Sequence, residues 1–401
     1  MKILVTDGDS RAALAIVRSL GKAGHEVIVG STRTRSLAGA SKYCGTGICY
    51  PDPDGYRESF VNFIAEYVAD ESVDVLLPVT DITTMSIGAN RDRFPASCAL
   101  PFPDIDTVNQ VADKAAMLAL AERLGVDVPR SRVLLASAEV DPANPGLAFP
   151  VVIKPFKSRV QADGGWIYTG VSYATTAAEL EHALQRLDPR IYPVLLQEKI
   201  VGPGMGLCVY AHQGTTFAAF SHRRLREKPP SGGVSVLRES AELDPLALRF
   251  SETMLQELGW HGVAMVEFKQ DVRDGRPKLM EINGRFWGSL QLAIDAGVDF
   301  PKLLIDAIQA PPSHRALEYR IGVRTRWLWG DVDALMIRLF HTAEQLDLPP
   351  GHPSKARYLR QFLTYDRNSR LEIERLDDPG PWAYETKQWL GSLLSALLPS
   401  G

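Results

Sequence analysis

The chain has 401 residues, 45% of them hydrophobic, a length sufficient for about two to three domains with buried cores. Its formal net charge of -4 provides no basic surface for nucleic acid, so we expect it to act on small molecules. The four cysteines, Cys44, Cys49, Cys98 and Cys208, form no CxxC pair or Cys/His cluster, which predicts reduced thiols and no zinc site. The short apolar N-terminal run, and the lack of any apolar stretch of roughly 18 or more residues, predict a soluble, cytoplasmic protein without an integral membrane segment.

The N-terminal part of the sequence alternates between strand and helix patterns. The runs "KILVTD" and "EVIVGS" predict buried strands, and "SRAALAIVRSLGKAG" between them predicts a helix with Ala13, Ile16, Val17 and Leu20 on one face. The unit recurs with the helix "YRESFVNFIAEYVADE" and the strand "DVLLPV". This order predicts a parallel sheet covered on both faces, which is a Rossmann-like α/β domain over residues 1–106.

The first turn of this domain lacks the dinucleotide-binding fingerprint. The segment "TDGDSRA" contains one glycine where G-x-G-x-x-G is needed, and the second strand ends in Ser31 and Thr32 instead of an acid that could hold a ribose. We therefore expect a structural or substrate-facing domain. The segment "TDITTMS" is predicted as a loop at the carboxyl end of the third strand, where open sheets bind ligands, so Thr80 and Asp81 are substrate candidates.

A long helix is predicted for "DTVNQVADKAAMLALAERLG", with Ala116, Leu120 and Leu124 facing inward. Lys114 is predicted in its first turn, where a cation is unfavourable to the helix dipole. This placement indicates a role other than capping, although most exposed lysines are merely solvated.

The segment "FPVVIKPFKSRVQADGGWIYTGVSY" is predicted to contain a strand, a polar loop and a second strand. Lys154 ends the first, apolar strand, and Gly164 and Gly165 lie in the loop. An ammonium group beside flexible loop amides can hold a polyanion, so we expect a phosphate clamp here. An ordinary hairpin loop is the alternative.

Farther along, "GLCVYA" and "TFAAFSHRRL" predict a hairpin that leads into "REKPPSGG". Arg224 and Arg226 are two residues apart, which predicts that they share one strand face, and Ser231 lies in the loop that follows. Such a basic pair suits a substrate carboxylate or phosphate, and it can equally well be solvated.

The segment "VAMVEFKQDVRDGRPKLMEINGR" predicts a second hairpin. A turn centred near Asp274 places Glu267 directly opposite Glu281, and Met265 opposite Asn283. Facing carboxylates repel each other, so they must either splay into water or hold a cation between them. Oxygen ligands of this kind suit Mg²⁺ or Mn²⁺, and a solvated hairpin face with scattered acids is the alternative.

The last part of the chain is predicted to be helical. One helix is expected in "GVRTRWLWGDVDALMIRLFHTAEQL" and another in "YETKQWLGSLLSALLPSG", where Leu390, Leu393, Leu394 and Leu397 form an apolar stripe. Core packing or a homodimer contact is expected for this stripe, because its polar face lacks the basic excess that a membrane surface prefers.

From Asp113 to Ala310, about half of the chain, the sequence resembles the ATP-grasp superfamily of the carbamoyl-phosphate synthase and biotin carboxylase type. The motifs "DK", "VIKP", "QEKIVG", "MVEF" and "MEINGR" occur in the order and at the separations usual in that superfamily. The resemblance implies a Rossmann-like domain over 1–106, a two-subdomain α+β ATP-grasp domain over 107–310 that divides near residue 198, and a C-terminal helical extension over 311–401.

The resemblance also implies a nucleotide site. Lys114 and Lys154 would contact the phosphates of ATP, beneath the loop that contains Gly164 and Gly165. The adenine would lie against the linker residues Glu198, Lys199, Ile200 and Val201. Two features depart from the superfamily pattern. The stretch after the linker has no acid to hold the ribose, and the phosphate-covering loop is less rich in glycine.

A metal site and a reaction follow from the same resemblance. Glu267, Glu281 and Asn283 would bind Mg²⁺ or Mn²⁺, and Arg285 would stabilise an acyl phosphate or a tetrahedral intermediate, unless it only pairs with a neighbouring acid. The implied activity is an ATP-dependent ligase that joins a carboxylate to an amine. The alternatives are an ATP-grasp kinase acting on a small molecule, a non-catalytic nucleotide-binding protein and, least favoured, an NAD(P)-dependent oxidoreductase.

Overall fold

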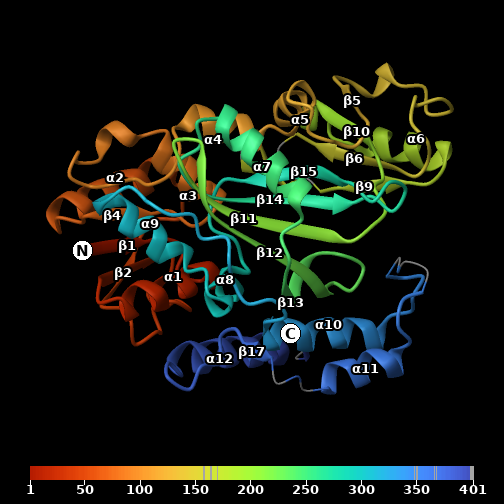
Figure 1. Cartoon of the computed structure of the whole chain (residues 1–401). Helices are drawn as coiled ribbons and strands as arrows, with labels where there is room; N and C mark the ends of the chain where they lie inside the picture. The colour runs from red at the N-terminus through yellow and green to blue at the C-terminus, as the bar shows by residue number, and fades with distance from the viewer. Residues whose placement is uncertain are drawn as a thin grey trace.

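The computed structural model describes residues 1–156, 159–162, 165–168, 170–346, 348, 351–364, 366 and 368–397. Figure 1 shows the N-terminal α/β domain on one side, a small sheet above the large central sheet, and the C-terminal helices below. None of the described helices has the length and apolar character needed to cross a membrane.

The N-terminal domain contains a parallel sheet in the order β3-β2-β1-β4. Its strands are β1 (Lys2–Val5), β2 (Glu26–Ser31), β3 (Thr46–Cys49) and β4 (Val75–Leu77), and its main helices are α1 (Arg11–Lys22) and α2 (Arg57–Asp70). The parallel α/β arrangement is confirmed, and all four residues predicted on the inner face of α1 are buried. The strand β3 was not predicted, because its residues are mostly exposed and carry no apolar alternation.

Two predictions about this region are wrong. The "TDITTMS" loop is mostly the helix α3 (Asp81–Gly88), whose first turn is fixed by a reciprocal capping pair of Thr80 and Thr83. The single long helix is two helices, α4 (Ile105–Ala112) and α5 (Lys114–Arg123), because the Asp113 side chain accepts hydrogen bonds from the first backbone N–H groups of α5.

This break also changes the buried face of α5. Ala116 is exposed and Leu124 is half-buried, contrary to the prediction, whereas Leu120 is buried as expected. The residues that enter the core with it are Met117, Leu118 and Ala121. The break leaves Lys114 as the first residue of α5.

A second, antiparallel sheet has the order β5-β10-β6-β9. Its strands are β5 (Ser131–Leu134), β6 (Val151–Pro155), β9 (Ser172–Ala174) and β10 (Val194–Glu198), with the helix α6 (Ala177–Arg186) following β9. The predicted strand "WIYTGVSY" is divided between β8 (Gly165–Tyr168) and β9, and β8 pairs with β7 (Arg159–Ala162) as a separate hairpin. Gly165 begins β8, and Gly164 lies outside the described residues.

The third sheet has seven strands in the order β15-β14-β11-β12-β13-β16-β17. They are β11 (Gly204–His212), β12 (Thr215–Lys228), β13 (Val234–Ala241), β14 (Gly262–Gln270), β15 (Pro277–Asn283), β16 (Arg324–Arg326) and β17 (Ser369–Leu371). Helices α5 and α7 (Pro245–Glu257) share a buried core with one face of this sheet. Helices α8 (Leu290–Ala296) and α9 (Phe300–Gln309) join the opposite face to the N-terminal domain. The two predicted hairpins, β11–β12 and β14–β15, are confirmed.

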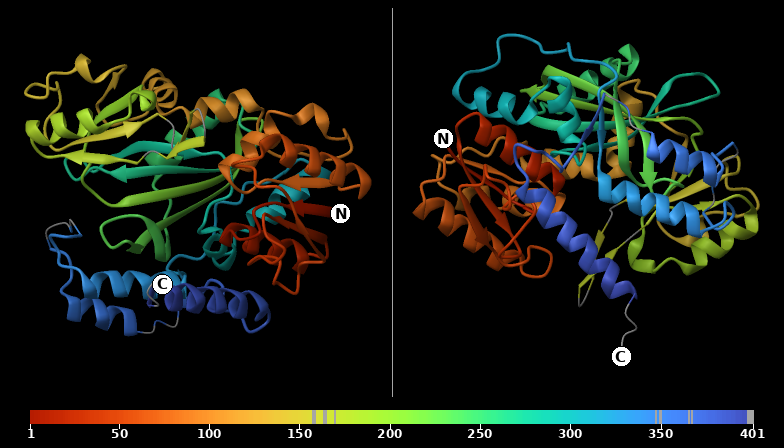
Figure 2. Two further views of the ribbon diagram at one scale, coloured as in Figure 1. Left: turned by 180° about the vertical axis from the view of Figure 1, so that it is seen from behind. Right: turned by 90° about the horizontal axis from the view of Figure 1, so that it is seen from below.

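The C-terminal part contains two strands, β16 and β17, that were not predicted, and both join the large sheet. Its helices are α10 (Leu328–Phe340), α11 (Lys355–Leu363) and α12 (Gly380–Leu397); the remaining short 3-10 turns are η1 (Arg91–Arg93), η2 (Ser137–Glu139) and η3 (Pro189–Ile191). Figure 2 shows α12 running back alongside the N-terminal domain. Its junction is held by the Arg18–Asp378 ion pair of 2.8 Å, in which both side chains are buried.

Helix α12 contacts α10 through aromatic residues. Trp389 stacks on Trp329 with 4.2 Å between ring centroids, and its indole N–H donates to Asp333. Leu390 and Leu394 are 45% and 60% exposed, so the stripe is not buried within the chain at these two positions. A homodimer contact stays a prediction for this face.

Candidate functional site

The β14–β15 hairpin brings two carboxylates face to face. Glu267 is paired with Glu281, and Met265 with Asn283, as the sequence predicted. A bulge follows, because Phe268 pairs with Leu279 and the register shifts by one residue. The two pairs Glu267–Glu281 and Met265–Asn283 therefore lie on the same side of the bulge, and both match the predicted register.

The structure holds the two acids together with an amide and a guanidinium. Asn283 Nδ2 donates to Glu281 Oε1 at 3.1 Å and to Glu267 Oε1 at 3.5 Å. Arg224 Nη2 donates to Glu267 Oε2 at 2.8 Å. Burial and the neighbouring Glu281 carboxylate raise the pKa of Glu267, and Arg224 opposes that rise. The Glu267–Glu281 pair therefore carries more negative charge than the Arg224 guanidinium balances.

Lysine side chains supply positive charge from other elements. Lys154 near the end of β6 is held near both acids, and its pKa is lowered to about 8, chiefly by burial; Lys114 and Lys269 add to the lowering, whereas Glu281 and Glu267 oppose it. The small sheet, the start of α5 and the β14–β15 hairpin thus converge on one site (Figure 1). The predicted residues Lys114, Lys154, Glu267 and Glu281 are brought together.

Lys269 is a member of this cluster that the sequence analysis missed. It lies two residues after Glu267 on β14, and its Nζ donates to the backbone carbonyl of Ile200 at 3.5 Å. Burial and the nearby Lys199 lower its pKa. The i, i+2 spacing from Glu267 was the signal that could have identified it.

Arg285 extends from the end of β15 toward the N-terminal domain. Its Nε donates to Asp81 Oδ1 at 2.9 Å, and its Nη2 donates to Asn283 Oδ1 at 3.4 Å. Two predicted site residues, Asp81 and Arg285, are therefore partners, and Asp81 is at the first position of α3. This ion pair joins the carboxyl end of the N-terminal sheet to the acid pair.

The prediction that Arg224 and Arg226 share a strand face is wrong. Their partners on β13, Arg238 and Leu237, are consecutive residues, which point to opposite faces, so a bulge at this point of β12 separates the two arginines. Arg224 binds Glu267, whereas Arg226 Nε binds Asp331 of α10 at 2.8 Å.

Ser231, the other residue in this predicted substrate region, is exposed in the turn between β12 and β13. A role of Ser231 in substrate binding stays a prediction.

The linker between the small and large sheets is Glu198 to Gly202. Burial tends to raise the pKa of Glu198, but hydrogen bonds from the Arg273 side chain and the Arg130 backbone N–H, both 2.9 Å, outweigh it and lower the pKa. Glu198 thus anchors the linker to neighbouring segments. The backbone carbonyl group of Ile200 accepts from Lys269 Nζ, and that of Val201 accepts from the backbone N–H of Val272, just after β14.

Gly202 ends the linker in a conformation that requires glycine. Its φ is +152°, and a Cβ at this position would overlap the backbone carbonyl oxygen of Gln270. The backbone of the linker is therefore packed directly on the end of β14, within reach of Lys269.

The donor set of this site fits a hard divalent cation. Glu267, Glu281 and Asn283 offer two carboxylates and one amide oxygen, the ligand types of Mg²⁺. The Asn283 amide N–H groups now lie between the two carboxylates, where they supply the positive end of a dipole. Among the described residues no group of three or more His, Cys, Asp or Glu side chains is arranged to hold a metal.

Comparison with known proteins shows which fold this architecture resembles. A family model described as "ATP-grasp in the biosynthetic pathway with Ter operon" matches residues 190–330. No curated protein sequence matches the chain significantly.

Three solved structures are similar over most of the chain. An L-amino acid ligase from Bacillus licheniformis is 17% identical, with 78% of this chain and 74% of that chain covered and a TM-score of 0.59. An N5-carboxyaminoimidazole ribonucleotide synthetase in complex with ADP is 14% identical, with 80% of each chain covered and a TM-score of 0.60. A biotin carboxylase with an ATP analogue from Campylobacter jejuni is 16% identical, with 80% and 74% covered and a TM-score of 0.61. The resemblance to the ATP-grasp superfamily is confirmed, and the chain has the ATP-grasp fold.

Proposed function

We propose that the protein is an ATP-dependent ligase that joins a carboxylate to an amine through an acyl phosphate, with release of ADP and phosphate. The observation that carries the proposal is the Glu267–Glu281 pair, with the half-buried Lys154 near enough to interact electrostatically with both acids. Two acids whose charges repel, beside cations whose charges also repel, form a site that a metal-bound triphosphate would balance.

Each group has a distinct role in this proposal. Lys114 and Lys154 bind the phosphates of ATP, and Glu267, Glu281 and Asn283 hold the divalent ion. The ion would neutralise phosphate charge when it is bound. The β7–β8 hairpin, in which Gly165 begins β8, would cover the phosphates. The linker Glu198, Lys199, Ile200 and Val201 would present its backbone to the adenine, with Lys269 fixing the carbonyl group of Ile200.

The reaction needs no protein nucleophile. An oxygen of the substrate carboxylate attacks the γ-phosphorus, and the bond to the ADP oxygen breaks. The amine then attacks the acyl carbon, phosphate leaves, and the amine loses one proton to give the amide. Arg285 is placed between the metal ligands and Asp81, where its guanidinium can stabilise the acyl phosphate or the tetrahedral intermediate. Arg224, Asp81 and Ser231 are the substrate candidates that stay in this proposal.

The test is ADP release from Mg·ATP with pooled small carboxylates, with and without amino acids as amines, and with hydroxylamine to trap an acyl phosphate as a hydroxamate. We expect hydroxamate with a carboxylate and hydroxylamine, and amine-dependent ADP release with amide formation when a carboxylate and an amine are supplied. Glu281→Gln should lose both, while Glu122→Gln, which removes an exposed acid of α5, should keep both.

The alternatives give other products in the same assay. A stable phosphorylated hydroxy compound and no hydroxamate would indicate a kinase. Binding of ATP with no ADP release under any substrate combination would indicate a non-catalytic nucleotide-binding protein. Either result contradicts the ligase.

A further inference from the structure

A cavity lies in the N-terminal domain, near the carboxyl ends of β2 and β3 and beneath α12. Its volume is about 420 Å³, within the range of small-molecule sites. It is lined by the loop after β2, by β3 and by one side of α12. In the order β3-β2-β1-β4, it lies at the opposite edge from β4, whose carboxyl end leads to Asp81 and the proposed ligase site.

The two ends of the chain build this cavity together. Tyr384 of α12 donates its hydroxyl to the backbone carbonyl of Arg35 at 3.0 Å and to Asp9 Oδ1 at 3.2 Å. At the start of α12, a Cβ on Gly380 would overlap the carbonyl oxygen of Ala40, so the helix is in direct backbone contact with the loop. The wall formed by α12 is therefore fixed in place by contacts on both sides of the cavity.

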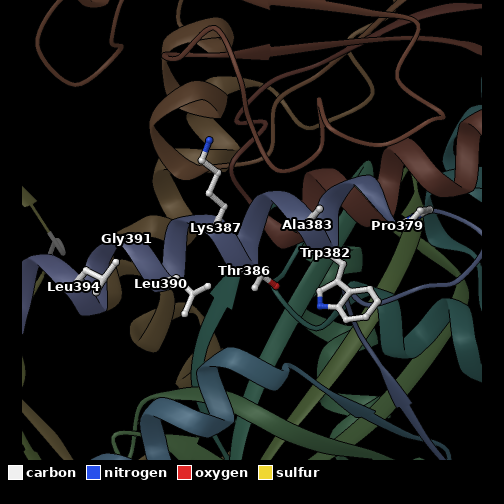
Figure 3. A pocket seen from close by; sticks show the side chains of 8 residues that line it. All are labelled: Pro379, Trp382, Ala383, Thr386, Lys387, Leu390, Gly391 and Leu394. Carbon is white, nitrogen blue, oxygen red and sulfur yellow. The ribbon is translucent and has the colours of Figure 1, made fainter.

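Three cations surround the cavity. Arg33 and Arg35 come from the loop after β2, and Lys387 comes from α12. Figure 3 shows Lys387 and Ala383 on one side of α12 and Trp382 and Leu390 on the other. Within the described part of the chain, none of these three cations forms an ion pair with a carboxylate.

One acid lies near the cations, and its oxygens are already engaged. Asp9 Oδ1 accepts from the Leu37 backbone N–H at 3.2 Å as well as from Tyr384, and Oδ2 accepts from Ser31 Oγ at 3.2 Å. Asp9 raises the pKa of Tyr384, as burial does to a greater extent, and Arg33 opposes that shift. The cavity keeps an excess of positive charge that one carboxylate cannot balance.

Beside the cations, the lining has the hydroxyl groups of Thr34, Ser36 and Tyr384 and an apolar part. Val29 and Ile48 form the floor, Ala383 adds a methyl group, and a Cβ on Gly47 would meet no atom within 4 Å. Such a lining suits a ring or short apolar body next to the cations. Two arginines and a lysine match the two negative charges and several acceptor oxygens of a phosphate monoester better than the single charge of a carboxylate.

We propose that this cavity binds a small organic phosphate monoester, with its phosphate on Arg33, Arg35 and Lys387 and its apolar body on Val29 and Ile48. The site is separate from the ATP site and does not depend on the ligase reaction. Because α12 forms one wall, the bound ligand ties the last helix of the chain to the first domain.

The experiment is calorimetric titration of the full chain with phenyl phosphate, with phenol and benzoate as comparison ligands. We expect wild-type protein to bind phenyl phosphate, to bind benzoate at least about tenfold more weakly, and not to bind phenol. The double variant Arg33→Gln/Arg35→Gln should lose at least about tenfold in affinity. Lys387→Gln should lose about threefold, and Lys42→Gln, an exposed lysine outside the lining, should match wild type.

A second measurement locates the ligand. Phenylglyoxal modifies accessible arginines, and peptide mass spectrometry should show that phenyl phosphate protects Arg33 and Arg35 but not the exposed Arg123. Lys154→Met, a change in the ATP site, should leave the phenyl phosphate affinity unchanged.

Three results would overturn the proposal. They are an affinity that survives Arg33→Gln/Arg35→Gln, an affinity lost with Lys154→Met, and equal affinity for phenyl phosphate and benzoate.

Discussion

Replacing Lys154 by methionine should stabilise the fold while removing ATP binding. The ordinary pKa of 10.5 falls to about 8 in the folded state, chiefly through burial. A shift of that size corresponds to about 3 kcal/mol, at about 1.4 kcal/mol per pKa unit, by which the folded state disfavours the charged lysine. Methionine has a similar length and no charge, so it relieves this cost without leaving a cavity.

The sign of the effect also predicts its pH dependence. At pH 7 the lysine is protonated in both states, and the full difference of about 3 kcal/mol separates the variant from wild type. Between pH 8 and 10.5 the unfolded chain binds the proton more tightly than the folded state, so wild-type stability rises with pH. The advantage of Lys154→Met should fall to about 1.4 kcal/mol at pH 9.5.

Urea denaturation at pH 7 and pH 9.5 measures both quantities, and a thermal-shift assay with Mg·ATP measures binding in the same samples. Lys42→Met, which changes an exposed lysine, should alter the free energy of unfolding by less than about 0.5 kcal/mol. A variant that is less stable than wild type at pH 7, or one that still gains stability from Mg·ATP, would refute this account of Lys154.

Three further substitutions probe other parts of the site. Glu281→Gln should leave the free energy of unfolding equal or higher, because it removes the repulsion that raises the pKa of Glu267, while the Mg²⁺-dependent thermal shift with ATP disappears; a preserved shift would contradict the metal role. Gly202→Ala should cost about 2 kcal/mol or more in urea denaturation, since its Cβ would overlap the Gln270 carbonyl, and a change of less than about 0.5 kcal/mol would contradict the strained linker. Arg285→Ala should alter stability by less than about 1 kcal/mol because its ion pair is exposed, yet reduce hydroxamate formation by about a hundredfold or more, whereas unchanged turnover would assign it a structural role.

The sequence predicted the acid pair because hairpin pairing is a local property. The pairs next to the turn, such as Phe268 with Leu279, are one residue out of the predicted register, and the bulge between them and Glu267 restores it, so that Glu281 lies opposite Glu267. The same reasoning failed for Arg224 and Arg226, because a bulge inside β12 reverses which face a residue occupies. The alternation of polar and apolar residues along β12 gives no sign of this bulge.

The order of the motifs predicted that distant segments meet at one site. Hydrophobic periodicity and residue spacing did not. Spacing alone does not bring Lys154 to the β14–β15 hairpin, which requires the packing of two sheets. The ion pair of Asp81 with Arg285 spans more than two hundred residues and was missed for that reason, although both residues had been singled out. Likewise, short strands such as β16 and β17 are stabilised by the sheet they join and carry little signal of their own.

The return of the C-terminal segment to the N-terminal domain is also a tertiary effect. Arg18, on the inward side of α1, donates to the carbonyl groups of Glu372 and Ile373 as well as to Asp378. A buried arginine in an otherwise apolar helix face was the available signal, because buried guanidinium groups are almost always paired. The partner could not be identified from the sequence.

Calorimetric titration of ATP into the protein, with and without Mg²⁺, and into Glu267→Gln, tests the central claim most directly. The account predicts micromolar binding that requires Mg²⁺ in wild type and is weakened at least about a hundredfold in Glu267→Gln, while Glu122→Gln binds as wild type does. Binding of ATP with the same affinity in the absence of Mg²⁺, or undiminished in Glu267→Gln, would contradict it.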